Sequence, residues 1–275
     1  MRLPERFIKS ISTRLKVMNG SLLNRIGGEI ASAIYAMDGC VFRNLGGNVE
    51  VKIGPEFRGV SEDYEIDSMK LVCRLLCEGD TAVDVGANVG LYSLLMGKLV
   101  GKGGKVYSFE PAQDSFRILI GHIELNSLGE VIEANQVLVG SEASVRMFYE
   151  DGMKGTNRVG GSTCPGFQSL LVGRQTIVLD DFLASKGRWP KLIKIDVEGY
   201  EIHVLRGARE TLKASQCTVL CELHSNLWYA MGNEWKDMIS LMAEVDYGLF
   251  HLNGEVFKDF DLSGRVILVL RPANK

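Results

Sequence analysis

The chain has 275 residues, of which 46% are hydrophobic and 24% charged, the composition of a globular protein with a substantial core. Its net charge of −3 argues against nucleic acid as the main partner, because phosphate binding needs a concentrated basic surface. Six cysteines without a CxxC pair indicate reduced thiols, and no apolar run is long enough to span a membrane. No signal peptide is apparent, so we expect a cytoplasmic protein.

Residues 2–36 carry apolar side chains at roughly helical spacing, which predicts a helical extension ahead of the main domain. Because the first part of this segment is basic, one interpretation is a helix that contacts a membrane surface or a partner. The other is a cap packed on the main domain with its basic face in solvent, and interruptions of the apolar pattern favour it. We therefore expect a helical cap with a short strand in residues 1–60 and the main domain in residues 61–275.

Beyond residue 60, patterns typical of strands and of helices alternate, which predicts an α/β fold with a parallel sheet and helices on both faces. A hairpin is expected at 249–257, around Asn253-Gly254. Residues 151–173 are rich in glycine and lack periodicity, so they predict a long loop that is functional or disordered. The other expected elements are helices at 61–77, 91–99, 113–125, 200–212 and 233–245, and strands at 82–85, 105–109, 131–139, 144–149, 175–179, 191–195, 217–221 and 265–270.

The segment Asp84–Gly90 joins a predicted strand to a predicted helix through a D-x-G-x-N-x-G turn. Gly86 allows a tight turn, and Gly90 allows a ligand to approach the start of the helix. A dinucleotide fold presents helix N–H groups to a pyrophosphate, which the carboxylate of Asp84 would repel. That carboxylate suits a ligand with a cationic amino group, such as the methionine end of S-adenosylmethionine. The alternative is a glycine turn without a ligand.

Acidic residues also follow the other predicted strands, and in an open α/β sheet ligands bind beyond the carboxyl ends of the strands. Glu110 lies twenty residues after Gly90, at the end of the second strand. This spacing places a carboxylate where it can accept hydrogen bonds from both hydroxyls of a ribose. The alternative is that Glu110 only stabilises the start of the helix that follows.

The strands predicted at 191–195 and 217–221 are followed by Asp196 with Glu198 and by Glu222 with His224, respectively. A carboxylate there could orient a substrate hydroxyl, and His224 could take its proton. The alternatives are capping by Asp196, pairing of Glu198 with a nearby cation, and a structural histidine. If the strand predicted at 217–221 continues as far as residue 224, Glu222 and His224 point to the same side of it. As a weaker hypothesis, Asp196, Glu222 and His224 bind a divalent cation such as Mg²⁺ or Mn²⁺.

Taken together, in order and in spacing, these motifs resemble the FkbM family of S-adenosylmethionine-dependent methyltransferases. The resemblance covers about residues 61–260 and implies a seven-stranded class I methyltransferase fold whose last strand is antiparallel. It also implies O-methylation of a sugar, glycan, glycolipid or polyketide-type hydroxyl acceptor. The matching segments are Asp84–Gly90, Phe109–Pro111, Leu179–Asp181, Ile193–Glu201 with Leu205–Ala208, and Glu222–His224.

The resemblance also implies roles for individual residues, which we expect to fall into two groups. The cofactor group is Asp84, Gly86, Asn88 and Gly90 at the methionine end and Glu110 at the ribose. From the predicted topology, and not from the resemblance, we expect Asn135 or Gln136 near the adenine, because they follow the third strand. The methyl-transfer group is Asp196, Glu198, Glu222 and His224. Our own hypothesis for this group, beyond the resemblance, is that His224 is the base and Asp196 orients the acceptor.

Other classes of protein are possible for this pattern. An NAD-dependent oxidoreductase also places an acidic residue on a ribose, but it should lack the carboxylate at Asp84. A non-catalytic module could keep the fold as a binding surface. A nucleic-acid methyltransferase fits poorly, because the chain lacks an Asn/Asp-Pro-Pro-aromatic motif for a flipped base.

Overall fold

The computed structural model describes residues 39–150, 157–159, 170–260 and 262–273. The expected helical extension at 2–36 and most of the expected loop at 151–173 lie outside these residues. Within the described part of the chain, none of the helices is long and apolar enough to cross a bilayer.

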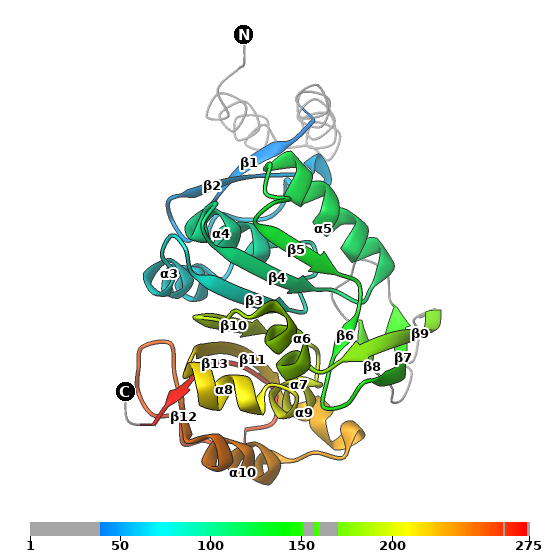
Figure 1. The fold of residues 1–275 in the computed structure, drawn as a ribbon, viewed down its shortest axis with the longest axis vertical. Helices are drawn as coiled ribbons and strands as arrows, with labels where there is room; N and C mark the ends of the chain where they lie inside the picture. Colours follow the sequence, from blue (N-terminus) through cyan, green and yellow to red (C-terminus); the bar gives the residue numbers. More distant parts are fainter. Residues whose placement is uncertain (1–38, 151–156, 160–169, 261, 274–275) are drawn as a thin grey trace, which may run out of the picture.

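A seven-stranded sheet forms the centre of the molecule (Figure 1). The strand order is β12-β13-β11-β10-β3-β4-β5. Neighbouring strands from β11 to β5 are parallel, whereas β13 runs antiparallel to both β11 and β12, as predicted for the last strand. The bounds are β3 (Thr81–Val85), β4 (Lys105–Phe109), β5 (Ile132–Asn135), β10 (Leu192–Ile195), β11 (Thr218–His224), β12 (Tyr247–Phe250) and β13 (Arg265–Pro272).

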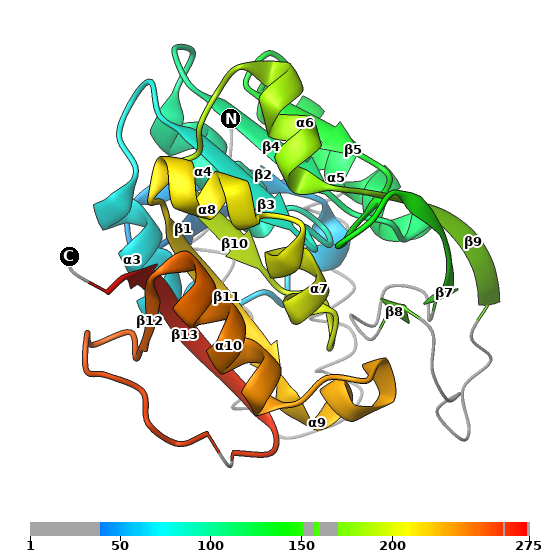
Figure 2. The same cartoon turned by 60° about the horizontal axis from the view of Figure 1, so that its bottom comes forward.

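The apolar strands carry a separate hydrophobic core on each face of the sheet, because successive side chains point to opposite faces. Val83 and Ile193 lie in one core, and their neighbours Ala82 and Leu192 lie in the other. Each fully buried valine, leucine or isoleucine contributes about 2 kcal/mol. The core with Ala82 is covered by α3 (Ile66–Leu75), α4 (Leu91–Val100) and α5 (Gln113–Leu125). The other, seen in front in Figure 2, is covered by α6 (Leu179–Lys186), α7 (Glu201–Arg206), α8 (Arg209–Ser215) and α10 (Trp235–Val245).

The described part of residues 1–60 packs on the main domain. It forms the antiparallel pair β1 (Val41–Leu45) and β2 (Val49–Ile53), followed by the 3-10 turn η1 (Pro55–Phe57). Val41 and Ile53 are completely buried in the same core as α4 and α5. A domain boundary at residue 60 stays a prediction.

A second, four-stranded sheet lies beside the main one (Figure 1), and it corrects the single strand predicted at 131–139. That segment divides into β5, in the main sheet, and β6, which pairs with β9. The chain changes sheets at Gln136-Val137, a step that depends on the pairing of β6 with β9. The strand order is β6-β9-β7-β8, with bounds β6 (Leu138–Val139), β7 (Ser144–Glu150), β8 (Arg158–Val159) and β9 (Leu170–Ile177).

Several predicted boundaries shift for local reasons. The helix predicted from residue 61 begins at Ile66, because Glu65 takes a left-handed φ of 43°. The helix predicted at 200–212 is divided into α7 and α8 around Gly207. A Cβ at Gly207 would lie 2.0 Å from the carbonyl oxygen of Gly140, so glycine allows this close approach. In the predicted hairpin, Phe250 and Val256 form one antiparallel bridge, and the Phe257 N–H donates to the Leu249 carbonyl oxygen at 2.9 Å. The remaining elements are α9 (Ser225–Trp228) and η2 (Tyr229–Met231).

Candidate functional site

A pocket of about 640 Å³, counted with its open mouth, lies beyond the carboxyl ends of β3, β4 and β10. One part of its wall is apolar and the other is acidic, which suits a ligand with a flat ring at one end and a positive charge at the other. The apolar wall is formed by Val85, Phe109, Pro111, Val137, Leu138, Val139, Phe148, Val159 and Val197. The polar lining is formed by Gly86, Asn88, Glu110, Asn157, Asp196, Glu198 and Tyr200.

The glycine turn after β3 is pressed against the turn after β10. Gly86 has a φ of +80°, and a Cβ there would lie 1.8 Å from the carbonyl oxygen of Asp196. Only glycine therefore allows both turns to meet at the pocket. Gly90 has a φ of +92°, and a Cβ there would lie 2.5 Å from Leu119 of α5. The predicted approach of a ligand to Gly90 stays a prediction.

Glu110 lies at the end of β4 and lines the pocket, although only 5% of its surface is exposed. Its two carboxylate oxygens accept backbone N–H groups from Asn88 at 2.7 Å and from Ala112 at 2.8 Å. Burial raises the pKa of Glu110 to about 7. Each oxygen keeps a further lone pair, so the carboxylate can still accept two hydroxyl groups, as recognition of a ribose requires.

Asp84 is completely buried and does not line the pocket. It neighbours Lys194 across the sheet, and both side chains lie on the face covered by α4. Ser93 of α4 donates a hydrogen bond of 2.6 Å to one carboxylate oxygen, and the Lys194 Nζ lies 3.8 Å from the other. Burial raises the pKa of Asp84. A direct role in cofactor binding stays a prediction for this residue.

Lys194 links Asp84 to the pocket. Its Nζ donates to the Asp196 carboxylate at 3.3 Å and to the Gly86 carbonyl oxygen at 3.2 Å. Burial alone would lower the pKa of Lys194, but the carboxylates of Asp196 and Asp84 outweigh it and raise the pKa. The lysine therefore stays charged, and it holds the two carboxylates and the glycine turn together.

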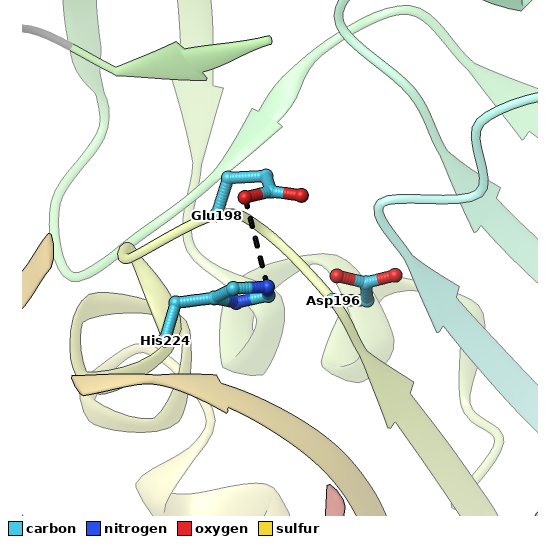
Figure 3. Close-up of side chains that lie close together, drawn as sticks. All are labelled: Asp196, Glu198 and His224. Carbon is cyan, nitrogen blue, oxygen red and sulfur yellow. Dashed lines mark ion pairs between the residues drawn. The ribbon is translucent and has the colours of Figure 1, made fainter. Parts of the chain in front are cut away.

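The turn after β10 directs two carboxylates toward the pocket. Glu198 has a left-handed φ of +48°, and Gly199 follows with a φ of +97°. A non-glycine residue in this conformation stores backbone strain, which is common where a side chain is aimed at a site. Burial raises the pKa of Glu198 despite the nearby His224 ring. Figure 3 shows the carboxylate of Glu198 above the imidazole ring of His224, joined to it by a dashed line, and the carboxylate of Asp196 beyond the edge of the ring.

His224 is the last residue of β11, which continues beyond its predicted end at Cys221. As expected, Glu222 and His224 are on the same side of the strand: the His224 Nε2 lies 3.6 Å from Glu222 Oε1 and 3.6 Å from Glu198 Oε2. The other ring nitrogen, Nδ1, lies 2.9 Å from Glu201 Oε1. Burial alone would lower the pKa of His224, but the bond to Glu201 and the surrounding carboxylates raise it.

Glu201 and Arg265 belong to the same cluster but were not predicted. Glu201 is completely buried at the start of α7. The sequence could have indicated this burial, because Glu201 falls at helical spacing with the apolar residues Leu205 and Ala208. Arg265 begins β13, pairs with His224 across the sheet and contacts the Glu222 carboxylate. Because β13 is antiparallel, its first residue reaches the edge where the parallel strands end.

A divalent cation has one candidate set of ligands among the described residues. Asp196, Glu198 and His224 can each direct one ligand atom so that all three lie within 4.8 Å of one another. Glu198 thus takes the position that the sequence hypothesis gave to Glu222. Two carboxylate oxygens and one imidazole nitrogen suit Mn²⁺ or Mg²⁺, although Lys194 already neutralises part of the charge on Asp196.

The two residues expected near an adenine do not line the pocket. Asn135 ends β5, and its carbonyl oxygen accepts the Glu110 N–H at 3.1 Å. Gln136 also lies outside the lining, and the pocket wall beyond β5 is formed by Val137 and Leu138 instead. The apolar pair offers a surface against which a flat base could pack.

Comparison with known proteins identifies relatives of this chain. Residues 84–249 match the methyltransferase FkbM domain. The hexuronic acid methyltransferase AglP of Haloferax volcanii is 28% identical over 183 residues, which are 66% of this chain and 69% of that protein.

Solved structures also match, each with low identity. Methyltransferase FkbM from Methylobacillus flagellatus has a TM-score of 0.44 and 16% identity, over 77% of this chain and 56% of that chain. The chain thus spans little more than half the length of that structure. Fibrillarin from Aeropyrum pernix, solved with bound S-adenosylmethionine, has a TM-score of 0.40 and 15% identity, over 71% of this chain and 68% of that chain.

Proposed function

Since the chain belongs to the methyltransferase FkbM family, whose reaction is S-adenosylmethionine-dependent methyl transfer, we propose that its acceptor is a hydroxyl group of a sugar or glycan. The family match argues against the NAD-dependent oxidoreductase alternative. A sugar acceptor is supported by the relative AglP, whose name states that it methylates a hexuronic acid.

The residues of the pocket offer partners for the adenine, the ribose and the sulfonium of the cofactor. Val137 and Leu138 offer an apolar surface to the adenine, and Glu110 offers two acceptor oxygens to the ribose hydroxyls. At the opposite end, the carboxylates of Asp196 and Glu198 favour a ligand with a positive charge. S-adenosylmethionine carries such a charge on its sulfonium, which supplies an already activated methyl group.

His224 is the residue that we assign as general base. Its Nδ1 is held by Glu201, so Nε2 is the nitrogen that can accept a proton from an acceptor hydroxyl. The carboxylates of Glu198 and Glu222, each 3.6 Å from Nε2, would stabilise the imidazolium that forms. Asp196 is assigned to orient the acceptor hydroxyl. A base of this kind contributes a factor of about 10² to 10⁴ to the rate.

One observation carries the proposal: a single pocket combines a carboxylate suited to a ribose with an acidic end next to a tethered, buried histidine. A neutral amine acceptor would not need the base, whereas a sugar hydroxyl does, because its own pKa is far above neutrality.

The test is a methyl-transfer screen with labelled S-adenosylmethionine against free and conjugated sugars, including hexuronic acids and their neutral counterparts. We expect an O-methylated sugar, with a His224→Ala variant that binds the cofactor normally but turns over about 10² to 10⁴ times more slowly. Transfer only to nitrogen, or full turnover of His224→Ala between pH 6 and 9, would contradict the proposal.

A further inference from the structure

We propose that Glu201 is a positioning residue for catalysis, which fixes the His224 ring and keeps its Nε2 free of hydrogen for the acceptor hydroxyl. The inference rests on the proposed function only in that it takes His224 as the base. Glu201 itself lies behind the ring, away from the pocket lining, so it acts through His224 rather than on a substrate.

Both carboxylate oxygens of Glu201 have partners. Its Oε1 accepts the Gly199 N–H at 2.8 Å and lies 2.9 Å from the His224 Nδ1. Its Oε2 accepts the Trp228 Nε1–H at 2.7 Å. Glu201 has no exposed surface, and His224 retains only 6% of its surface. With both residues buried, this contact holds the Nδ1 edge of the ring against Glu201.

The chemistry of a carboxylate then determines which tautomer is present. An ionised carboxylate only accepts hydrogen bonds, so the Nδ1 of His224 must carry the hydrogen. In a neutral ring, the lone pair is therefore on Nε2, which faces Glu198. The same logic operates in catalytic triads, where a buried acid holds the imidazole in the correct tautomer and stabilises the imidazolium that forms.

A purely structural role for Glu201 makes a different prediction. Glu201 begins α7 and ties its first turn to Gly199 and to Trp228 of α9. If this tie were its only purpose, then removing the Trp228 bond would impair the enzyme as much as removing the carboxylate. The Trp228 Nε1 contacts the far oxygen of the carboxylate and so leaves the bond to His224 in place.

The experiment compares three variants of the full chain with the wild type: Glu201→Gln, Glu201→Leu and Trp228→Phe. We measure cofactor affinity, kcat and KM for a sugar acceptor, and thermal denaturation as a check on folding. We expect Glu201→Leu to lose a factor of about 10² to 10⁴ in kcat, with cofactor affinity unchanged. Glu201→Gln should lose less, because its amide keeps one acceptor oxygen, and Trp228→Phe should stay within about tenfold of the wild type.

A spectroscopic readout tests the tautomer without relying on turnover. In long-range ¹H–¹⁵N spectra of histidine-labelled protein at high pH, neutral His224 should show a protonated Nδ1 in the wild type and in Trp228→Phe. Glu201→Leu should lose this signature. A protonated Nε2 in the wild type, or an unchanged kcat in folded Glu201→Leu, would overturn the inference, as would an equal loss in Trp228→Phe. If no acceptor is methylated at all, the proposed function fails, and the spectra still decide the tautomer.

Discussion

Glu110 gives the clearest quantitative prediction, because its environment sets a pH dependence for cofactor affinity. Burial raises the pKa of its carboxyl to about 7 in the free protein. Ribose hydroxyls donate hydrogen bonds to the ionised carboxylate, so binding favours the ionised form and lowers the pKa in the complex. Affinity should therefore be highest above pH 7 and should weaken as pH falls through 7.

The size of the effect follows from the fraction of ionised carboxylate. One unit below a pKa of about 7, roughly a tenth of the protein carries the ionised form, and one unit above, roughly nine tenths does. If the complex keeps Glu110 ionised throughout this range, then the Kd at pH 6 should be about tenfold weaker than at pH 8. This ratio corresponds to about 1.4 kcal/mol.

The assay is titration calorimetry with S-adenosylhomocysteine between pH 6 and 8 at constant ionic strength. The matched control is Glu110→Gln, which keeps the shape of the side chain but cannot ionise. The amino group of the ligand titrates equally with both proteins, so the difference between them isolates Glu110. Parallel pH dependences for the two proteins would refute the assignment of Glu110 to the ribose.

Three other perturbations test the rest of the site. Gly86→Ala should destabilise the protein by about 2 to 4 kcal/mol in thermal denaturation, because its methyl group would collide with the Asp196 carbonyl at a positive φ. An unchanged melting temperature would contradict the contact between the two turns. Asp84→Ala should cost about 3 to 5 kcal/mol in denaturant unfolding, because it leaves the buried Lys194 with one carboxylate fewer. Unchanged stability with lost cofactor affinity would instead indicate direct contact between Asp84 and the ligand. If the group around Asp196 needs a divalent cation, then EDTA should stop methyl transfer and Mn²⁺ or Mg²⁺ should restore it, and undiminished activity in EDTA would exclude this requirement.

The sequence predicts well which polar residues gather at the carboxyl ends of the strands, because a polar residue directly after an apolar strand marks the point where that strand ends. Glu110, Asp196 and Glu198 line one pocket, as expected from their positions after β4 and β10. The strand β11 continues to His224, so Glu222 and His224 lie on the same side of the strand, as expected.

The direction of a side chain within a strand is harder to predict. Asp84 was expected at the pocket, but it alternates with Val83 and Val85 and so points to the face of the sheet under α4. The pattern contained this information, since Ala82 and Asp84 share a face by the period of two. The position of Asp84 at the start of the glycine turn, where a ligand contact was expected, concealed this information.

Contacts between distant parts of the chain could not be predicted from the sequence. Glu201 reaches His224 only because α7 packs beside β11, and Arg265 joins the cluster only because β13 enters the sheet in the antiparallel direction. The change of sheets at Gln136-Val137 depends on the partner β9, whose pairing no local pattern specifies. These features depend on tertiary packing, whereas the elements themselves depend on local periodicity.

The most direct test of the account is a crystal structure of the protein with S-adenosylhomocysteine. The account predicts the ribose on the Glu110 carboxylate, the adenine against Val137 and Leu138, and the sulfur directed toward Asp196 and His224. Nucleoside density elsewhere on the protein, or the reverse orientation with the adenine at the acidic end, would contradict it.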